Sequence, residues 1–165
     1  RLIKHQAEHD PLTDLLNRGS YNRIFDLYEK DKKDFALILV DVDTFKSVND
    51  NYGHATGDII LKKVAHLLTT TFRTIDYICR IGGDEFAIIM VEMTSDLSYT
   101  ITEKITEINR QLAISDENIP AVSLSVGVAF TDRKNPGDSQ FTDADTALYY
   151  TKEHGKKGCS FYPVE

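Results

Sequence analysis

Two short apolar runs on either side of a glycine pair constrain the fold of this 165-residue chain most strongly. Residues 77–81 and 86–91 are rich in β-branched and aromatic side chains, so each run predicts a β-strand. Gly82 and Gly83 lie between the runs and predict a hairpin, because glycine adopts the positive φ angles of a tight turn. Since they lack a Cβ, these glycines also leave room for a ligand against the backbone.

Two acids follow the glycines directly. Asp84 and Glu85 would repel each other on such a turn unless a cation or a proton donor lay between them. Arg80, at the end of the first strand, is placed to anchor the hairpin. The segment therefore predicts a ligand or metal site and not a simple connection between strands.

A second acidic segment follows the most continuous apolar run. Residues 35–40 predict a central strand buried on both faces, and Asp41 and Asp43 come after it. An acid at the end of a buried strand, where a helix begins, is a common position for a ligand site. The spacing places both acids on one face, where one metal could contact both. Asp41 is the stronger candidate, since Asp43 could instead cap the helix that begins near Thr44.

Charge and cysteine content narrow the class of protein. The net charge of −7 argues against broad binding to DNA or RNA, whereas a small anionic nucleotide needs only a few local cations and a metal. The two cysteines have no zinc or disulfide spacing, which favours a reduced, cytoplasmic setting. The chain begins without methionine, so we expect a fragment of a longer protein. An upstream sensor or dimerisation domain would precede it, and upstream segments could anchor the full-length protein in a membrane.

The remaining periodicities predict the fold. Residues 1–9 predict the end of an upstream linker helix, so the domain is expected to occupy residues 10–165. The other elements expected are helices at residues 18–30, 44–50, 59–72, 96–114 and 141–154, a turn at residues 51–58 and a strand at residues 122–130. In the last helix, Tyr149 is expected to face the core. This order predicts an α/β sandwich with a mostly antiparallel central sheet flanked by helices. Asp41 and Asp84 would meet there on neighbouring strands.

Four stretches of the sequence resemble one family. Residues 82–86 match the GGDEF signature letter for letter, and residues 41–58 agree with D-[IV]-D-x-F-K-x-[IV]-N-D-x-x-G-H-x-x-G-D at every defined position. Residues 10–18 resemble D-x-L-T-G-L-x-N-R, with Asp14 in place of a glycine, and residues 144–157 resemble A-D-x-A-L-Y-x-A-K-x-x-G-R-N. The chain thus resembles the GGDEF-domain diguanylate cyclases, and its expected fold is similar to nucleotidyl cyclase and polymerase palm domains.

The resemblance implies a reaction. Two GTP molecules would condense into cyclic di-GMP and two pyrophosphates, by Mg²⁺-assisted attack of a 3′-hydroxyl on an α-phosphate. Asp41, the carbonyl of Val42 and Asp84 would bind Mg²⁺, with Mn²⁺ as an alternative ion. Either carboxylate, with Asp84 preferred to Asp41, could help to deprotonate the attacking hydroxyl. Glu85 would have a supporting catalytic role.

The resemblance also implies contacts to GTP. The amides of Thr44, Phe45 and Lys46 would bind the terminal phosphates, and Asn49 and Asp58 would bind the guanine edge. Gly82 and Gly83 would leave room for the nucleotide. Lys152 and Lys156 would bind the triphosphate. The chemistry of Asp58 suits this role, because a carboxylate accepts from the N1–H and N2–H₂ groups of guanine, which adenine lacks. Lys156 stands where the family has arginine, which keeps the charge and loses bidentate geometry.

Regulation and assembly are implied in the same way. Arg73 and Asp76 precede the GGDEF turn by the same number of residues as the inhibitory product site of many diguanylate cyclases. Both side chains can pair with guanine. One domain would hold one GTP, so activity would require a two-fold homodimer. The alternative is a catalytically weak or silent module that binds cyclic di-GMP or GTP. The presence of both signature acids, Asp84 and Glu85, favours the enzyme.

Overall fold

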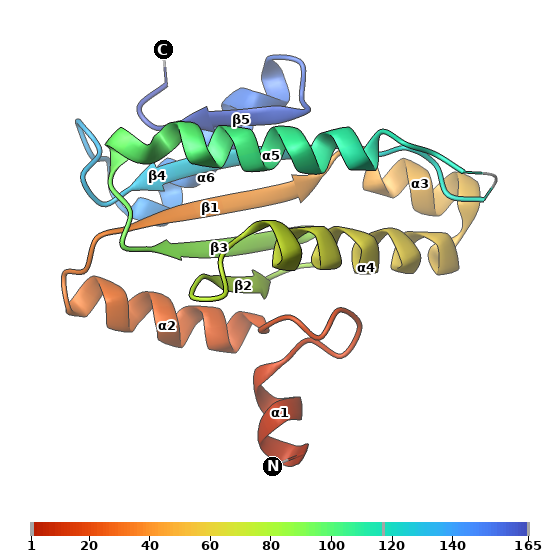
Figure 1. Ribbon diagram of the computed structural model, residues 1–165, viewed down its shortest axis with the longest axis horizontal. Helices are drawn as coiled ribbons and strands as arrows, with labels where there is room; N and C mark the ends of the chain where they lie inside the picture. Colours follow the sequence, from red (N-terminus) through yellow and green to blue (C-terminus); the bar gives the residue numbers. More distant parts are fainter. Residues whose placement is uncertain (1, 117, 165) are drawn as a thin grey trace.

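The computed structural model describes residues 2–116 and 118–164. Within these residues, five strands form one sheet in the order β2-β3-β1-β4-β5 (Figure 1). Their bounds are β1 Phe35–Val42, β2 Tyr77–Arg80, β3 Glu85–Val91, β4 Leu124–Phe130 and β5 Gly158–Phe161. β1 pairs antiparallel with both β3 and β4, whereas β5 runs parallel to β4. The predicted α/β fold with a mostly antiparallel sheet and a central first strand is confirmed.

Helices cover both faces of the sheet. Their bounds are α1 Leu2–Glu8, α2 Arg18–Lys30, α3 Phe45–Tyr52, α4 His54–Thr71, α5 Ser98–Leu112 and α6 Gln140–Glu153, with a short 3-10 turn at Ser95–Leu97. Figure 1 shows α4 and α5 in front of the sheet, α6 behind it, and α1 projecting away from the remaining elements. Two apolar cores result, one under α4 and α5 and one under α2 and α6.

Strand β1 separates the two cores. All eight of its residues are buried, as expected for a strand covered by helices on both faces. Alternate side chains serve opposite cores, because Ala36 and Ile38 belong to the core of α4 and α5, while Phe35 and Leu37 belong to that of α2 and α6. Asp41 continues the second series, which directs it toward the side of α6.

The region after β1 differs from the expectation. Helix α4 begins at His54, so the turn predicted over residues 51–58 is reduced to Gly53. This glycine lies between the end of α3 and the start of α4, and it has a φ of +90°. Because glycine adopts such a φ without a Cβ clash, one residue is enough to reverse the chain.

The C-terminal region contains two further differences. Strand β5 is only four residues long, and its short polar sequence did not predict a strand. Tyr149 was expected to face the core but is 65% exposed, because the buried stripe of α6 consists of Gln140, Asp143, Ala144, Ala147, Leu148 and Thr151. Helix α6 is capped by Ser139, whose hydroxyl accepts from the amide of Thr142.

The described part of the chain contains no helix that could span a membrane. None of its helices combines the length and the apolar composition that are needed to cross a bilayer.

Candidate active site

The turn between β2 and β3 presents the two signature acids. Its glycines are not among the residues with positive φ, so the expected tight-turn geometry is wrong. The connection from Arg80 to Glu85 leaves four residues for the turn, and a turn of this length does not require left-handed glycines. The expected open space is present at Gly83, where a Cβ would meet no atom within 4 Å, but not at Gly82, where a Cβ would lie 2.7 Å from Oε1 of Glu85.

Arg80 anchors this hairpin, as predicted. Its Nη2 donates to the Gly83 carbonyl at 2.7 Å, and its Nε donates to the Gly82 carbonyl at 3.2 Å. The opposite side of the guanidinium pairs with Asp10, with Nη1 3.1 Å from Oδ2. Arg18 adds a bond of 3.0 Å from Nη1 to the carbonyl of Ile81.

Asp10 is a site residue that sequence reasoning missed. Its Oδ2 accepts from the amide and the hydroxyl of Thr13, both at 2.8 Å. Burial alone would raise the pKa of Asp10, but the hydrogen bonds from Thr13 and Arg80 lower it below its ordinary value. The available signal was the Asp-x-x-Thr spacing, which is typical of a side chain that caps a local turn.

The structure brings Asp41 and Asp84 together, as predicted. Asp41 lies opposite Glu85 in the β1–β3 register, and the amide of Val42 donates to the carbonyl of Asp84 at 3.2 Å. Burial and the adjacent Asp41 carboxylate raise the pKa of Asp84 to about 6. Two adjacent carboxyl groups do not ionise independently, because the negative charge of each disfavours ionisation of the other.

Lys152 reaches this carboxyl pair from α6. Its Nζ forms an ion pair with Oδ2 of Asp41. Burial alone would lower the pKa of Lys152, but the hydrogen bond to Asp41 raises it. The second oxygen of Asp41, Oδ1, is buried and has no hydrogen-bond partner within the described residues. A buried carboxylate oxygen without a donor is suited to a cation.

The donor set fits a divalent ion that shares its coordination with a substrate. No group of three or more His, Cys, Asp or Glu side chains in the described ranges could hold a metal alone. Mg²⁺ is commonly bound through one or two carboxylates, with phosphate oxygens and water completing the octahedron. Asp41, Asp84 and the intervening backbone at Val42 offer that minimal set.

Asp43 has different surroundings from Asp41. Its carboxylate accepts from the hydroxyls of Ser123 and Ser125, both at 2.6 Å, and from the amide of Lys157 at 3.2 Å. The residue at the start of α3 is Thr44, which makes no side-chain capping bond. The expectation that Asp43 caps this helix is therefore wrong.

The residues expected to read guanine lie at the junction of α3 and α4. Asn49 projects from α3 so close to Gly57 that a Cβ there would lie 2.0 Å from its Oδ1. That Oδ1 is buried and, among the described residues, has no hydrogen-bond donor. Asp58, next to Gly57 on α4, is exposed. The junction thus holds one unsatisfied amide oxygen and one accessible carboxylate.

The residues expected to hold phosphate lie on two segments. Phe45 and Lys46 begin α3 directly after Thr44, which has a φ of 55°. The first amides of a helix have no intrahelical acceptor, so they remain available to an anion. The side chain of Lys46 is 91% exposed and pairs with Asp50 at 3.2 Å. Lys156 lies beyond the end of α6, the helix that carries Lys152.

Arg73 and Asp76 pair with each other. Nη2 of Arg73 lies 2.7 Å from Oδ1 of Asp76, whose side chain is 0% exposed. Asp76 also accepts from the amide of Val91 at 3.2 Å. The Arg73 side chain is 35% exposed, and its Nε and Nη2 donate to Asp76 and to the carbonyl of Val91. Val91 ends β3, about 20 Å along the strand from the hairpin acids.

Comparisons with known proteins agree with this geometry. The sequence profile described as "Diguanylate cyclase, GGDEF domain" matches residues 7–158. The chain is 33% identical over 158 residues to the diguanylate cyclase DgcM of Escherichia coli K12, which aligns 93% of this chain with 38% of DgcM. It is 35% identical over 160 residues to the diguanylate cyclase DosC of the same strain, which aligns 93% of this chain with 35% of DosC.

A solved structure gives the same result for the fold. The coiled coil and GGDEF domain of DgcB from Caulobacter crescentus, in complex with c-di-GMP, superposes with a TM-score of 0.80 at 28% identity. The match covers 97% of this chain and 88% of that chain. The chain belongs to the GGDEF domain family of diguanylate cyclases. It spans less than two-fifths of the length of the curated relatives DgcM and DosC.

Proposed function

We propose that this domain is a diguanylate cyclase, which condenses two GTP molecules into cyclic di-GMP and two pyrophosphates. In each half-reaction the 3′-hydroxyl oxygen of one GTP attacks the α-phosphorus of the other. A new P–O bond forms, the bond to the β-phosphate oxygen breaks, and pyrophosphate leaves. The observation that carries the proposal is the adjacent pair Asp41 and Asp84, with one buried carboxylate oxygen that has no donor in the described chain.

Mg²⁺ is the ion that this proposal requires, with Mn²⁺ as an alternative. Asp41, Asp84 and the carbonyl of Val42 would hold it beside the triphosphate. When bound, the ion would stabilise negative charge on the α-phosphate and the leaving pyrophosphate. Its positive charge would also replace the contact that Lys152 makes with Asp41, which leaves the lysine free to pair with phosphate.

Asp84 is the candidate for the proton transfer. A general base must lie within hydrogen-bond reach of the proton that it removes, and Asp84 is half-buried beside Asp41, where the proposal places the triphosphate. Glu85 is exposed and lies opposite Asp41 in the strand register, which supports its assignment to a supporting role.

Guanine selectivity is assigned to Asn49 and Asp58. The exposed carboxylate of Asp58 can accept from N1–H and N2–H₂, and the unsatisfied oxygen of Asn49 can accept a further donor. The amides of residues 44–46, with Lys152 and Lys156, would bind the triphosphate. The open space beside Gly83 would admit the nucleotide, with Gly82 next to it.

The active unit follows from the stoichiometry. One domain with one guanine site holds one GTP, and the attacking hydroxyl must therefore come from a nucleotide on a second copy. The proposed active form is a two-fold homodimer, assembled through an upstream domain of the full-length protein.

Product inhibition at Arg73 is a further part of the proposal. The partly exposed side chain of Arg73 can donate to O6 and N7 of guanine, while Asp76 holds its orientation. Arg73→Ala should abolish tight binding of cyclic di-GMP and spare turnover. Unchanged binding of cyclic di-GMP in calorimetry would reject the site.

A product assay tests the central activity. The chain is incubated with GTP and Mg²⁺ at high protein concentration, and the products are resolved by chromatography. The wild type should form cyclic di-GMP, and Asp84→Ala should form none while it still binds GTP. If the wild type binds GTP or cyclic di-GMP but forms no product, the domain is a nucleotide-binding regulatory module and the proposal fails.

A further inference from the structure

The carboxylate of Asp43 joins three separate parts of the chain. It follows β1 and is buried, and both of its oxygens accept hydrogen bonds. Ser123 and Ser125 donate from the segment that begins β4, and the amide of Lys157 donates from the connection between α6 and β5. The two hydroxyls and the amide all donate to this one carboxylate, so Asp43 links the start of β4 to the connection between α6 and β5.

The connection that Asp43 holds has an unusual backbone. Gly155, Lys156 and Lys157 are consecutive residues with positive φ, at 104°, 59° and 50°. Glycine takes this conformation freely, but each lysine in it is destabilising by about 1 kcal/mol. Such a conformation persists only where neighbouring contacts maintain it. The contacts are a bond from the Lys156 amide to the Thr151 carbonyl at 3.0 Å and the bond from the Lys157 amide to Asp43.

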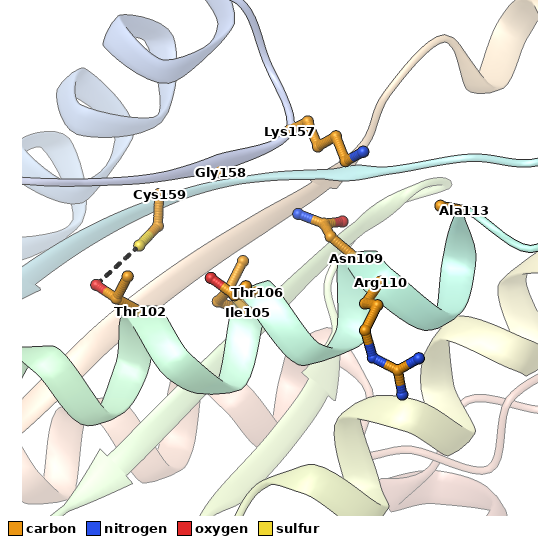
Figure 2. A pocket seen from close by; sticks show the side chains of 9 residues that line it. All are labelled: Thr102, Ile105, Thr106, Asn109, Arg110, Ala113, Lys157, Gly158 and Cys159. Carbon is orange, nitrogen blue, oxygen red and sulfur yellow. Dashed lines mark hydrogen bonds between the residues drawn. The ribbon is translucent and has the colours of Figure 1, made fainter.

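The two lysines of this connection have different surroundings. Figure 2 shows the side chain of Lys157 at one end of a pocket of about 400 Å³ between α5 and β5, with Asn109 beside it. Asp43 accepts its hydrogen bond from the backbone amide of Lys157, so the charged side chain of Lys157 takes no part in this contact. Lys156 is exposed and precedes it directly. The bond to Asp43 therefore fixes the backbone position from which Lys156 extends.

We propose that Asp43 is a positioning residue for triphosphate recognition. It holds residues 155–157 in the left-handed conformation that keeps Lys156 beside the site reached by Lys152. Its own oxygens are occupied by Ser123, Ser125 and the Lys157 amide, so it acts through the loop and not as a metal ligand. This assignment rests on the proposed binding of GTP.

The test compares GTP with GMP, because only GTP carries the phosphates that Lys156 would contact. Affinities of the wild type, Asp43→Asn and Asp43→Ala for both nucleotides are measured by calorimetry. Asp43→Ala should weaken GTP binding about tenfold, the loss expected for one charge-assisted contact, and leave GMP binding unchanged. Asp43→Asn has the same shape and one remaining acceptor oxygen, so it should fold and show a smaller loss.

Hydrogen exchange gives a second readout. In Asp43→Asn and Asp43→Ala, the Lys157 amide should exchange faster than in the wild type, because its acceptor is weakened or removed. Exchange in α3 and α4, where Asn49 and Asp58 lie, should not change. This pattern separates a local loop effect from general destabilisation.

The matched control is Asp143→Asn. Asp143 is also buried and also holds a loop, with Nε of Arg133 at 2.7 Å and the amide of Gly137 at 2.8 Å, but at the opposite end of α6. Its substitution should lower stability without changing the ratio of GTP to GMP affinity. Equal losses for GTP and GMP in the Asp43 variants, or no loss for GTP, would overturn the assignment. A wild type that binds neither nucleotide would refute the proposed function itself.

Discussion

At the residue scale, the candidate site is built on two adjacent carboxyl groups, of which Asp41 pairs with Lys152. Asp41 and Asp84 come from neighbouring strands, and Lys152 neutralises only one negative charge. Ionisation of the second carboxyl is therefore opposed by burial and by its neighbour, which is why the pKa of Asp84 is raised. A divalent ion would remove this conflict, since it balances both charges.

The raised pKa predicts how stability depends on pH. The folded-state pKa of Asp84 is about 6 and its ordinary value is 3.8, so the folded state binds the proton more tightly. The contribution of protonated Asp84 to the free energy of unfolding is fully present below pH 4 and is lost as the pH rises through 6. Asp84→Asn should thus raise the free energy of unfolding at pH 8 by about 1 kcal/mol, a value reduced for its partly exposed position.

Urea unfolding at pH 3.5 and pH 8 measures this effect. The variant and the wild type should have similar stability at pH 3.5 and differ at pH 8. Asp26→Asn, on the exposed face of α2, serves as the control and should show no such difference. A wild type that is equally or more stable than Asp84→Asn at pH 8 would contradict the interpretation of the carboxyl pair.

A second prediction concerns the proposed contact between Asn49 and guanine. In Gly57→Ala, the new Cβ would lie 2.0 Å from Oδ1 of Asn49 and 3.1 Å from Cζ of Phe45, so Asn49 must move. Alanine favours the helix by about 1 kcal/mol over glycine, which offsets part of the strain. GTP affinity should fall about tenfold, while the thermal midpoint changes little.

Fluorescence titration with GTP measures that affinity. The control is Gly19→Ala, because a Cβ there would meet its nearest atoms at 3.5 and 3.6 Å, which are ordinary contact distances. GTP binding in Gly57→Ala as tight as in the wild type would exclude Asn49 from guanine recognition.

Single residues differed in how well the sequence predicted them. Asp41 and Asp84 could be paired because Asp41 follows one strand signal and Asp84 precedes another, and an antiparallel pair places the end of one strand beside the start of its neighbour. The bonds of Asp43 to Ser123 and Ser125 could not be predicted, because they join residues about eighty positions apart. The same holds for Asp10 and Arg80, whose contact forms only when the entry segment packs on β2. A carboxylate has many possible donors, and only the tertiary fold selects among them.

At the element scale, α6 is the component that completes the site, and a close approach to β4 sets its position. A Cβ on Gly127 would lie 2.1 Å from the amide nitrogen of Leu148 and 2.3 Å from the carbonyl oxygen of Ala144. The backbones of strand and helix are therefore in direct contact at this glycine. The contact brings the C-terminal half of α6 close enough for Lys152 to reach Asp41.

This contact predicts a severe effect of Gly127→Ala. The methyl group would meet backbone atoms, which cannot rotate away as a side chain can, so α6 must shift. The variant should lose about 3 kcal/mol of unfolding free energy in urea. Gly83→Ala, where the added Cβ meets no atom within 4 Å, should keep wild-type stability. A fully stable Gly127→Ala would show that α6 is not fixed by this contact.

The elements followed the sequence signal to different extents. Helix α2 has the predicted bounds of residues 18–30, because a strong apolar face and the capping Asn17 act together. Helix α4 began earlier than predicted, since Gly53 and Gly57 suggested a loop although Gly57 is inside the helix and packs against α3. Strand β5 was missed because four residues carry too little periodicity, and its pairing with β4 is decided by tertiary contacts.

At the scale of the whole molecule, the fold gathers the residues of the proposed nucleotide site at one end of the sheet. The carboxyl pair, the start of α3 and the lysines around the end of α6 all adjoin the end of β1 and the start of β4. The net charge of −7 makes a second acidic domain a poor partner at long range, so assembly would depend on specific contacts or on an upstream domain. A chain with one such site per copy needs two copies to join two GTP molecules.

The most direct measurement is the initial rate of pyrophosphate release and cyclic di-GMP formation, with GTP and Mg²⁺, over a range of protein concentrations. Two pyrophosphates should appear for each cyclic di-GMP. At low concentration the rate should rise with the square of the protein concentration, because two copies must meet. Bound GTP without release of pyrophosphate at any concentration would contradict the assignment as a diguanylate cyclase.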